Sequence, residues 1–219
     1  MASDSAVRFD AATAVLRGQV RPAAAGDAWA ALVLCHGHHE DMDAALLIAL
    51  AGRASEEGLW TLRFNFAFRD AGTEPSGGHA DEISDLREAI GYARKTSGME
   101  SVFVAGRGIG AWATVAAVTD ETTAGAILLG LSYSGQEERR MALERLDEYE
   151  IPTLILVGFE SDQTDLPALR ELAAALPHLD LEIIAGADHR LEDAGGKPMT
   201  AAVLEKCEAW LRVRKGARP

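Results

Sequence analysis

The chain has 219 residues, of which 48% are hydrophobic and 25% charged, and this length and composition suit one globular α/β domain. Its formal net charge of −13 at pH 7 excludes nucleic acid and anionic membranes as favourable partners, because both repel an acidic surface. The first residues lack the basic and apolar regions of a signal peptide, and no apolar run is long enough to span a membrane. Only two cysteines occur, Cys35 and Cys207, so we expect reduced, core-packed thiols in a cytoplasmic protein.

Strands and helices alternate in the predicted chain after two short opening strands. Apolar runs of strand length predict strands at residues 6–9, 14–20, 31–37, 60–66, 101–106, 124–131, 151–158 and 179–186. Apolar spacing and end signals predict helices at residues 44–57, 79–98, 109–118, 137–149, 166–177 and 198–213, with a polar loop at 67–78. Repeated βα units of this kind predict the α/β fold class, a mostly parallel twisted sheet with helices on both faces.

Polar residues and glycines gather where the predicted parallel strands end. In such sheets the ligand site lies at the carboxyl ends of the strands. Five segments meet this description, at residues 36–41, 65–69, 106–110, 158–165 and 186–189. Their shared position indicates one functional site and is stronger evidence than any single motif.

The segment "VFVAGRGIGAW" runs from a strand through a glycine-rich turn into a helix. This is the layout of the nucleophile elbow, G-x-S-x-G, in which a serine occupies a strained turn. Here Gly108 stands at the position of the serine. Taken alone, the segment also fits a tight turn that packs a helix against a strand, because glycine tolerates positive φ and close approach.

A family resemblance rests on five segments in order: "LVLCHGHHEDMD", "LRFNFAFRDAG", "VFVAGRGIGAW", "IPTLILVGFESD" and "IAGADHRL". Together they resemble the small α/β-hydrolases of the dienelactone-hydrolase-like group over nearly the whole chain, from about Val15 to Leu211. The resemblance implies a single α/β-hydrolase domain over residues 1–219. About twenty residues, enough for one helix, separate the strand ending at Leu131 from the strand starting at Thr153, so we expect no cap domain.

The resemblance also implies roles for residues at the strand ends. His189 matches the general-base histidine, and Asp162 matches the acid that orients it, with Glu160 as an alternative. The backbone N–H groups of His38 and Ile109 match the donors of an oxyanion hole. Because these donors belong to the backbone, they do not depend on the side chains at those positions.

Gly108 at the nucleophile position departs from the family pattern. Acyl transfer through a covalent intermediate needs an oxygen or sulfur nucleophile, and loss of a triad serine costs about 10⁶ in kcat. Cys35 is expected to point into the core, and Ser132 and Ser134 follow the neighbouring strand rather than the elbow. Ordinary serine esterase chemistry should therefore be nearly absent.

Further residues at the strand ends are candidates for binding substrate: His36, Gly37, His39 and Arg107. Arg107 also fits a surface charge or a lid over the site. The run "HGHHED" has the residue types of a zinc site, but a polar loop at the mouth of a pocket is the simpler interpretation, so we expect no metal and no cofactor.

Three functions remain open from the sequence. In the first, the pocket binds a small carbonyl or carboxylate ligand, and His189 and Asp162 can carry out general-base chemistry on it. In the second, the protein is an active serine esterase in which Gly108 was introduced by engineering. In the third, it is a binding scaffold without turnover. Without a cap, the site should be open or covered by a neighbouring subunit of a homodimer.

Overall fold

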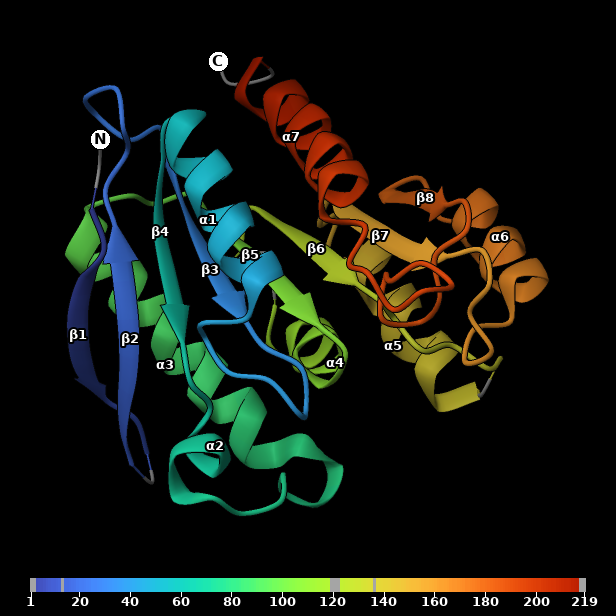
Figure 1. Ribbon diagram of the computed structural model, residues 1–219, viewed down its shortest axis with the longest axis horizontal. Helices are drawn as coiled ribbons and strands as arrows, with labels where there is room; N and C mark the ends of the chain where they lie inside the picture. The colour runs from blue at the N-terminus through green and yellow to red at the C-terminus, as the bar shows by residue number, and fades with distance from the viewer. Residues whose placement is uncertain (1–2, 13, 119–122, 136, 217–219) are drawn as a thin grey trace.

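The computed structural model describes residues 3–12, 14–118, 123–135 and 137–216. These residues form an eight-stranded sheet in the order β1-β2-β4-β3-β5-β6-β7-β8 (Figure 1). β1 (Ser5–Asp10) and β2 (Val15–Arg21) pair antiparallel, and β2 pairs antiparallel with β4 (Leu59–Phe64). Every other pairing in the sheet is parallel, as expected from the alternating strands and helices.

The parallel strands other than β8 are buried along nearly their whole length, which explains their continuous apolar sequences. Besides β4, the strands with parallel neighbours are β3 (Ala30–Cys35), β5 (Val102–Arg107), β6 (Gly125–Leu129), β7 (Thr153–Gly158) and β8 (Leu179–Ile184). β8 lies at the edge of the sheet and is only partly buried. The predicted α/β class is therefore confirmed.

Helices cover both faces of the sheet and enclose two apolar cores (Figure 1). On one face, α1 (Ala45–Glu56) and α7 (Thr200–Gly216) pack against the sheet. The other face is covered by α3 (Ala80–Ser97), α4 (Ile109–Ala117), α5 (Glu137–Glu148) and α6 (Leu166–Ala175). This arrangement leaves the carboxyl ends of the parallel strands free to form a site.

The predicted loop at residues 67–78 is partly helical, which the sequence reading missed. It contains α2 (Ala67–Ala71) and the short 3₁₀ helix η1 (Gly77–His79). β4 also ends earlier than predicted, because the backbone N–H of Phe66 donates to His36 Nε2 at 3.1 Å instead of joining the sheet. The next N–H, of Ala67, donates to the Asp85 carboxylate at 2.8 Å and starts α2.

No cap domain is evident in the part of the chain that the structure describes. Between the end of β6 at Leu129 and the start of β7 at Thr153, α5 is the helix present. The described helices also include none that is both long and apolar enough to cross a membrane.

Candidate functional site

The elbow, residues 106–110, joins β5 to α4 with Gly108 at its tip. Gly108 has φ 53° and ψ −114°, and its N–H donates to the Leu129 carbonyl at 3.1 Å. A positive φ is costly for residues with a Cβ and marks a strained turn. The backbone therefore has the strained strand-to-helix turn that the elbow motif describes, although the residue at its tip is glycine.

The three glycines of the elbow are present for different reasons. A Cβ on Gly106 would lie 2.2 Å from the Gly110 carbonyl oxygen, and one on Gly110 would lie 2.8 Å from the His36 carbonyl oxygen, so neither position accepts a side chain. At Gly108, by contrast, the nearest atom to an added Cβ would be Gly37 Cα, at an ordinary 3.7 Å. The elbow therefore has room for a side chain at its tip.

The oxyanion loop, residues 36–43, lies beside the elbow and carries the first expected donor. The hydrogen bonds between described residues give no partner to the backbone N–H of His38 or of Ile109. Ile109 is the first residue of α4, where an N–H has no acceptor within the helix. Both N–H groups are therefore available to a ligand oxygen.

His36, predicted to bind substrate, is completely buried and does not line the cavity at the elbow, so the geometry favours a structural role instead. Its Nε2 accepts the hydrogen bond from the Phe66 N–H, which leaves the proton on Nδ1, where it donates to the Gly37 carbonyl at 2.7 Å. Burial lowers the pKa of His36, in keeping with this neutral form. His36 thus connects the start of the oxyanion loop to the end of β4.

Two side chains from the end of β4 hold the rest of the oxyanion loop. The Asn65 amide oxygen accepts the Met42 N–H at 2.8 Å, and the buried Arg63 guanidinium donates to the Met42 carbonyl. Arg63 also donates to the Asp43 carboxylate at 2.9 Å. The loop is thus fixed by buried hydrogen bonds at both of its ends.

Arg107 is mostly buried, which contradicts its interpretation as a surface charge. Its guanidinium donates to the Glu40 carboxylate and, at 2.7 Å, to the Arg190 carbonyl. Burial lowers the pKa of Arg107, and only 14% of its side chain is exposed. It connects the oxyanion loop to the histidine loop, residues 185–192, and also lines the cavity.

The histidine loop follows β8 and brings His189 to the cavity. His189 Nδ1 lies 3.3 Å from Asp162 Oδ1, yet it makes no hydrogen bond of acceptable geometry to any described residue. Asp162 is 81% exposed. The pair is therefore a loose contact, as catalytic pairs often are before a ligand tightens them.

Neighbouring acids have other roles. Asp188 accepts the backbone N–H groups of Arg190 and Glu192 at 2.8 and 3.0 Å and therefore stabilises the turn of the histidine loop. Glu160 is exposed, and no ion pair joins it to His189 among the described residues. Asp162 is accordingly the better candidate for orienting His189.

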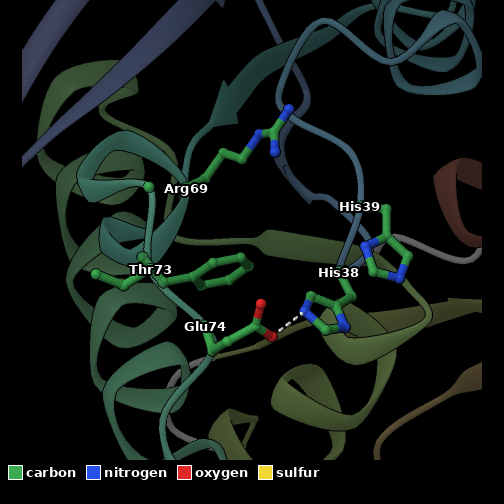
Figure 2. A pocket seen from close by; sticks show the side chains of 7 residues that line it. His38, His39, Arg69, Thr73 and Glu74 are labelled. Carbon is green, nitrogen blue, oxygen red and sulfur yellow. Dashed lines mark hydrogen bonds and ion pairs between the residues drawn. The ribbon is translucent and has the colours of Figure 1, made fainter.

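The cavity at the elbow has a volume of about 580 Å³ and brings together most of the predicted residues. Its lining includes Gly37, His38, His39, Arg107, Gly108, Ile109 and His189. A smaller pocket of about 190 Å³ adjoins it, where His38 Nε2 lies 2.9 Å from the Glu74 carboxylate (Figure 2). His38 and His39 stack with ring centroids 4.2 Å apart and line both spaces.

Side chains that the sequence reading did not select also line the cavity: Trp112, Arg139 and Gln163. Trp112 could have been found, because it follows Gly108 by one helical turn and therefore lies on the same side of α4. Arg139 lies on α5, where eight of the twelve residues are charged, so its sequence does not single out one arginine. The described residues contain no group of three or more His, Cys, Asp or Glu placed to hold a metal ion.

The described residues place no replacement nucleophile at the elbow. Cys35 is fully buried beneath it, and burial raises the pKa of its thiol to about 12. Ser132 lines the cavity, but its hydroxyl accepts a hydrogen bond from Arg139 at 3.1 Å. Ser134 is exposed and does not line the cavity.

Comparisons with known proteins agree with this architecture. The family model described as an alpha/beta hydrolase domain matches residues 28–209. No curated protein matches the chain.

Solved structures share the fold at low sequence identity. A protein of unknown function from Agrobacterium tumefaciens, regarded as a candidate alpha/beta hydrolase, is 20% identical with a TM-score of 0.78, over 98% of both chains. Dienelactone hydrolase from Anabaena variabilis is 21% identical with a TM-score of 0.75, over 96% of this chain and 97% of its own. A serine hydrolase without a lid from Xanthomonas campestris is 16% identical with a TM-score of 0.75, over 99% and 97%.

Proposed function

Since this chain belongs to the alpha/beta hydrolase family, we propose that it binds a small carbonyl- or carboxylate-containing ligand at the elbow and acts on it without forming an acyl-enzyme. His189, oriented by Asp162, is the general base of this proposal. The ligand oxygen accepts hydrogen bonds from the backbone N–H groups of His38 and Ile109. Such preorganised donors stabilise negative charge that develops on an oxygen.

One observation carries the proposal: the elbow keeps its strained backbone although its tip has no side chain. The φ of 53° at Gly108 and the 3.7 Å clearance to Gly37 Cα describe a turn with room for a nucleophile that is absent. The empty space suits a water molecule or part of the ligand. His189 then takes a proton from that water or from the ligand itself.

A role in binding without turnover is the second candidate. The loose contact between His189 and Asp162, and the 81% exposure of Asp162, favour it, because a general base works best when its orientation is fixed. The two candidates differ in their dependence on His189. Catalysis needs the imidazole, whereas binding through the backbone donors does not.

Hydrolysis of p-nitrophenyl acetate by four proteins tests the proposal: wild type, His189→Ala, Gly108→Ser and Gly108→Ser/His189→Ala. Wild type should hydrolyse the ester slowly, without a burst, and His189→Ala should abolish this activity. Gly108→Ser should raise kcat by up to about 10⁶-fold with a burst of p-nitrophenol, and the added His189→Ala should remove the gain. Wild-type turnover that His189→Ala leaves unchanged contradicts general-base catalysis and favours the binding role.

A further inference from the structure

Arg139, the third residue of α5, places a cation in the cavity wall. Its Nη1 donates to the carbonyl and the hydroxyl of Ser132 at 2.7 and 3.1 Å. Its guanidinium also lies over the Trp112 ring, with Cζ 4.6 Å from the ring centroid. These contacts fix the side chain in a partly buried position without neutralising its charge.

The remaining arginines of this region have acidic partners or lie nearer to solvent. Arg107 donates to Glu40, and Arg140, next to Arg139 in the sequence, pairs with Glu144 at 2.8 Å. Arg190 lines the same cavity but is exposed. Arg139 makes no ion pair with any described carboxylate, although the chain has a formal net charge of −13.

Hydrogen-bond donors also go unused around Arg139. A guanidinium has five N–H donors, and the bonds to Ser132 use only Nη1. Neither Nε nor Nη2 of Arg139 donates to a described residue, and the buried Trp112 Nε1–H finds no acceptor among those residues either. Glu40 and Glu192 also line the cavity, but neither forms an ion pair with Arg139 among the described residues, so the Arg139 guanidinium keeps a positive charge and free N–H donors.

The position of Arg139 relative to the elbow determines what it can recognise. Trp112 lies one helical turn after Gly108, and its backbone N–H donates to the Gly108 carbonyl at 3.3 Å. Arg139, stacked on Trp112, therefore lines the same cavity as the donors of His38 and Ile109. A single ligand in this cavity therefore faces both the residues that carry the backbone donors and the guanidinium.

We propose that Arg139 determines specificity by binding a carboxylate on the ligand, so that the site prefers small molecules in which a carboxylate lies a few bonds from the reacting carbonyl. A planar guanidinium with free N–H donors matches a carboxylate geometrically, and such charge-assisted hydrogen bonds are strong. This inference rests on the proposed function, because it takes the carbonyl end of the ligand to lie at the elbow.

Binding of monomethyl succinate and of dimethyl succinate, measured by ligand-observed NMR titration, tests the inference on the full, unaltered chain. The two esters differ only in that one end is a carboxylate in the first and a methyl ester in the second. Wild type should bind monomethyl succinate about 10- to 100-fold more tightly than the diester. Arg139→Gln should remove this preference, and Arg139→Lys should keep part of it.

Arg140→Gln is the matched control, because it removes an adjacent positive charge that is already paired with Glu144. It should leave both affinities unchanged. Equal binding of the two esters to wild type, or a preference that survives Arg139→Gln, overturns the role of Arg139 and leaves the proposed function intact. Failure of wild type to bind either ester at millimolar concentration contradicts the proposed function and the inference together.

Discussion

The two sides of the cavity are held in place very differently. On one side, buried hydrogen bonds from His36, Arg63 and Asn65 fix the oxyanion loop. On the other side, His189 contacts Asp162 at 3.3 Å without hydrogen-bond geometry, and Asp162 is 81% exposed. The structure therefore holds the groups proposed to bind a carbonyl oxygen more firmly than the groups proposed to move a proton.

This difference is consistent with a protein in which binding has been kept while nucleophilic catalysis has not. Backbone donors need a rigid loop, since a misplacement of 1 Å weakens both hydrogen bonds. An acid that orients a histidine matters most when that histidine activates a serine, and here the position holds Gly108. The predictions below change one side or one feature at a time.

The largest effect is expected from Gly106→Ala. The new Cβ would lie 2.2 Å from the Gly110 carbonyl oxygen, so the elbow has to shift, and we expect a loss of about 3 kcal/mol or more in the free energy of unfolding. Gly108→Ala meets no close atom and should cost only about 1–2 kcal/mol, from its positive φ. Urea unfolding followed by circular dichroism measures both, and equal losses would contradict the distinction between the two glycines.

Substitution of His36 and of His189 should show that the two sides of the cavity contribute differently to the stability of the protein. His36→Ala leaves the Phe66 N–H and the Gly37 carbonyl unpaired in a buried site, so we expect a loss of about 3 kcal/mol in the free energy of unfolding. His189→Ala removes a partly exposed side chain and should change the free energy of unfolding by less than about 0.5 kcal/mol. Comparable losses in the two variants, measured by the same urea unfolding, would show that the histidine loop is as firmly held as the oxyanion loop.

Asp85, which holds the start of α2, should make the stability of the protein sensitive to pH. Burial raises the pKa of its carboxyl from the ordinary 3.8 to about 6, so the folded protein binds a proton more readily than the unfolded chain. The resulting contribution to stability is fully present below pH 3.8 and is lost as the pH rises through 6.

Relative to Asp85→Asn, the wild-type free energy of unfolding should therefore fall by at most about 3 kcal/mol between pH 4 and pH 7. The variant keeps an oxygen that accepts the Ala67 N–H, and it removes the titration. Urea midpoints at several pH values measure the difference. A difference that stays constant, or grows in favour of the wild type with rising pH, would contradict the raised pKa.

The sequence predicted the parallel sheet and the location of the site because these depend on local patterns. Continuous apolar runs such as β3 appear only where a strand is buried on both faces, and ligand sites follow the carboxyl ends of such strands. Glycine spacing likewise located the elbow at residues 106–110. The number of residues between β6 and β7 is enough for one helix, and for this reason the sequence predicted a single helix there and no cap domain.

The roles of individual side chains were harder to predict, because they depend on contacts between distant segments. His36 and His38 lie two residues apart in one motif, yet His36 is fully buried and His38 lines the cavity. Arg139 and Arg140 are adjacent, and only the three-dimensional packing of α5 directs one to Trp112 and the other to Glu144. Periodicity does not distinguish such neighbours when the helix is charged nearly all round.

The most direct test of the account is covalent labelling with a fluorophosphonate, followed by intact-protein mass spectrometry. The account holds that the elbow lacks only a nucleophile, so wild type should gain no mass, Gly108→Ser should gain a single adduct, and Gly108→Ser/His189→Ala should lose it. An adduct on the wild-type chain would reveal another nucleophile in the site. A folded Gly108→Ser protein that remains unlabelled would show that the cavity no longer supports hydrolase chemistry, and would contradict the account.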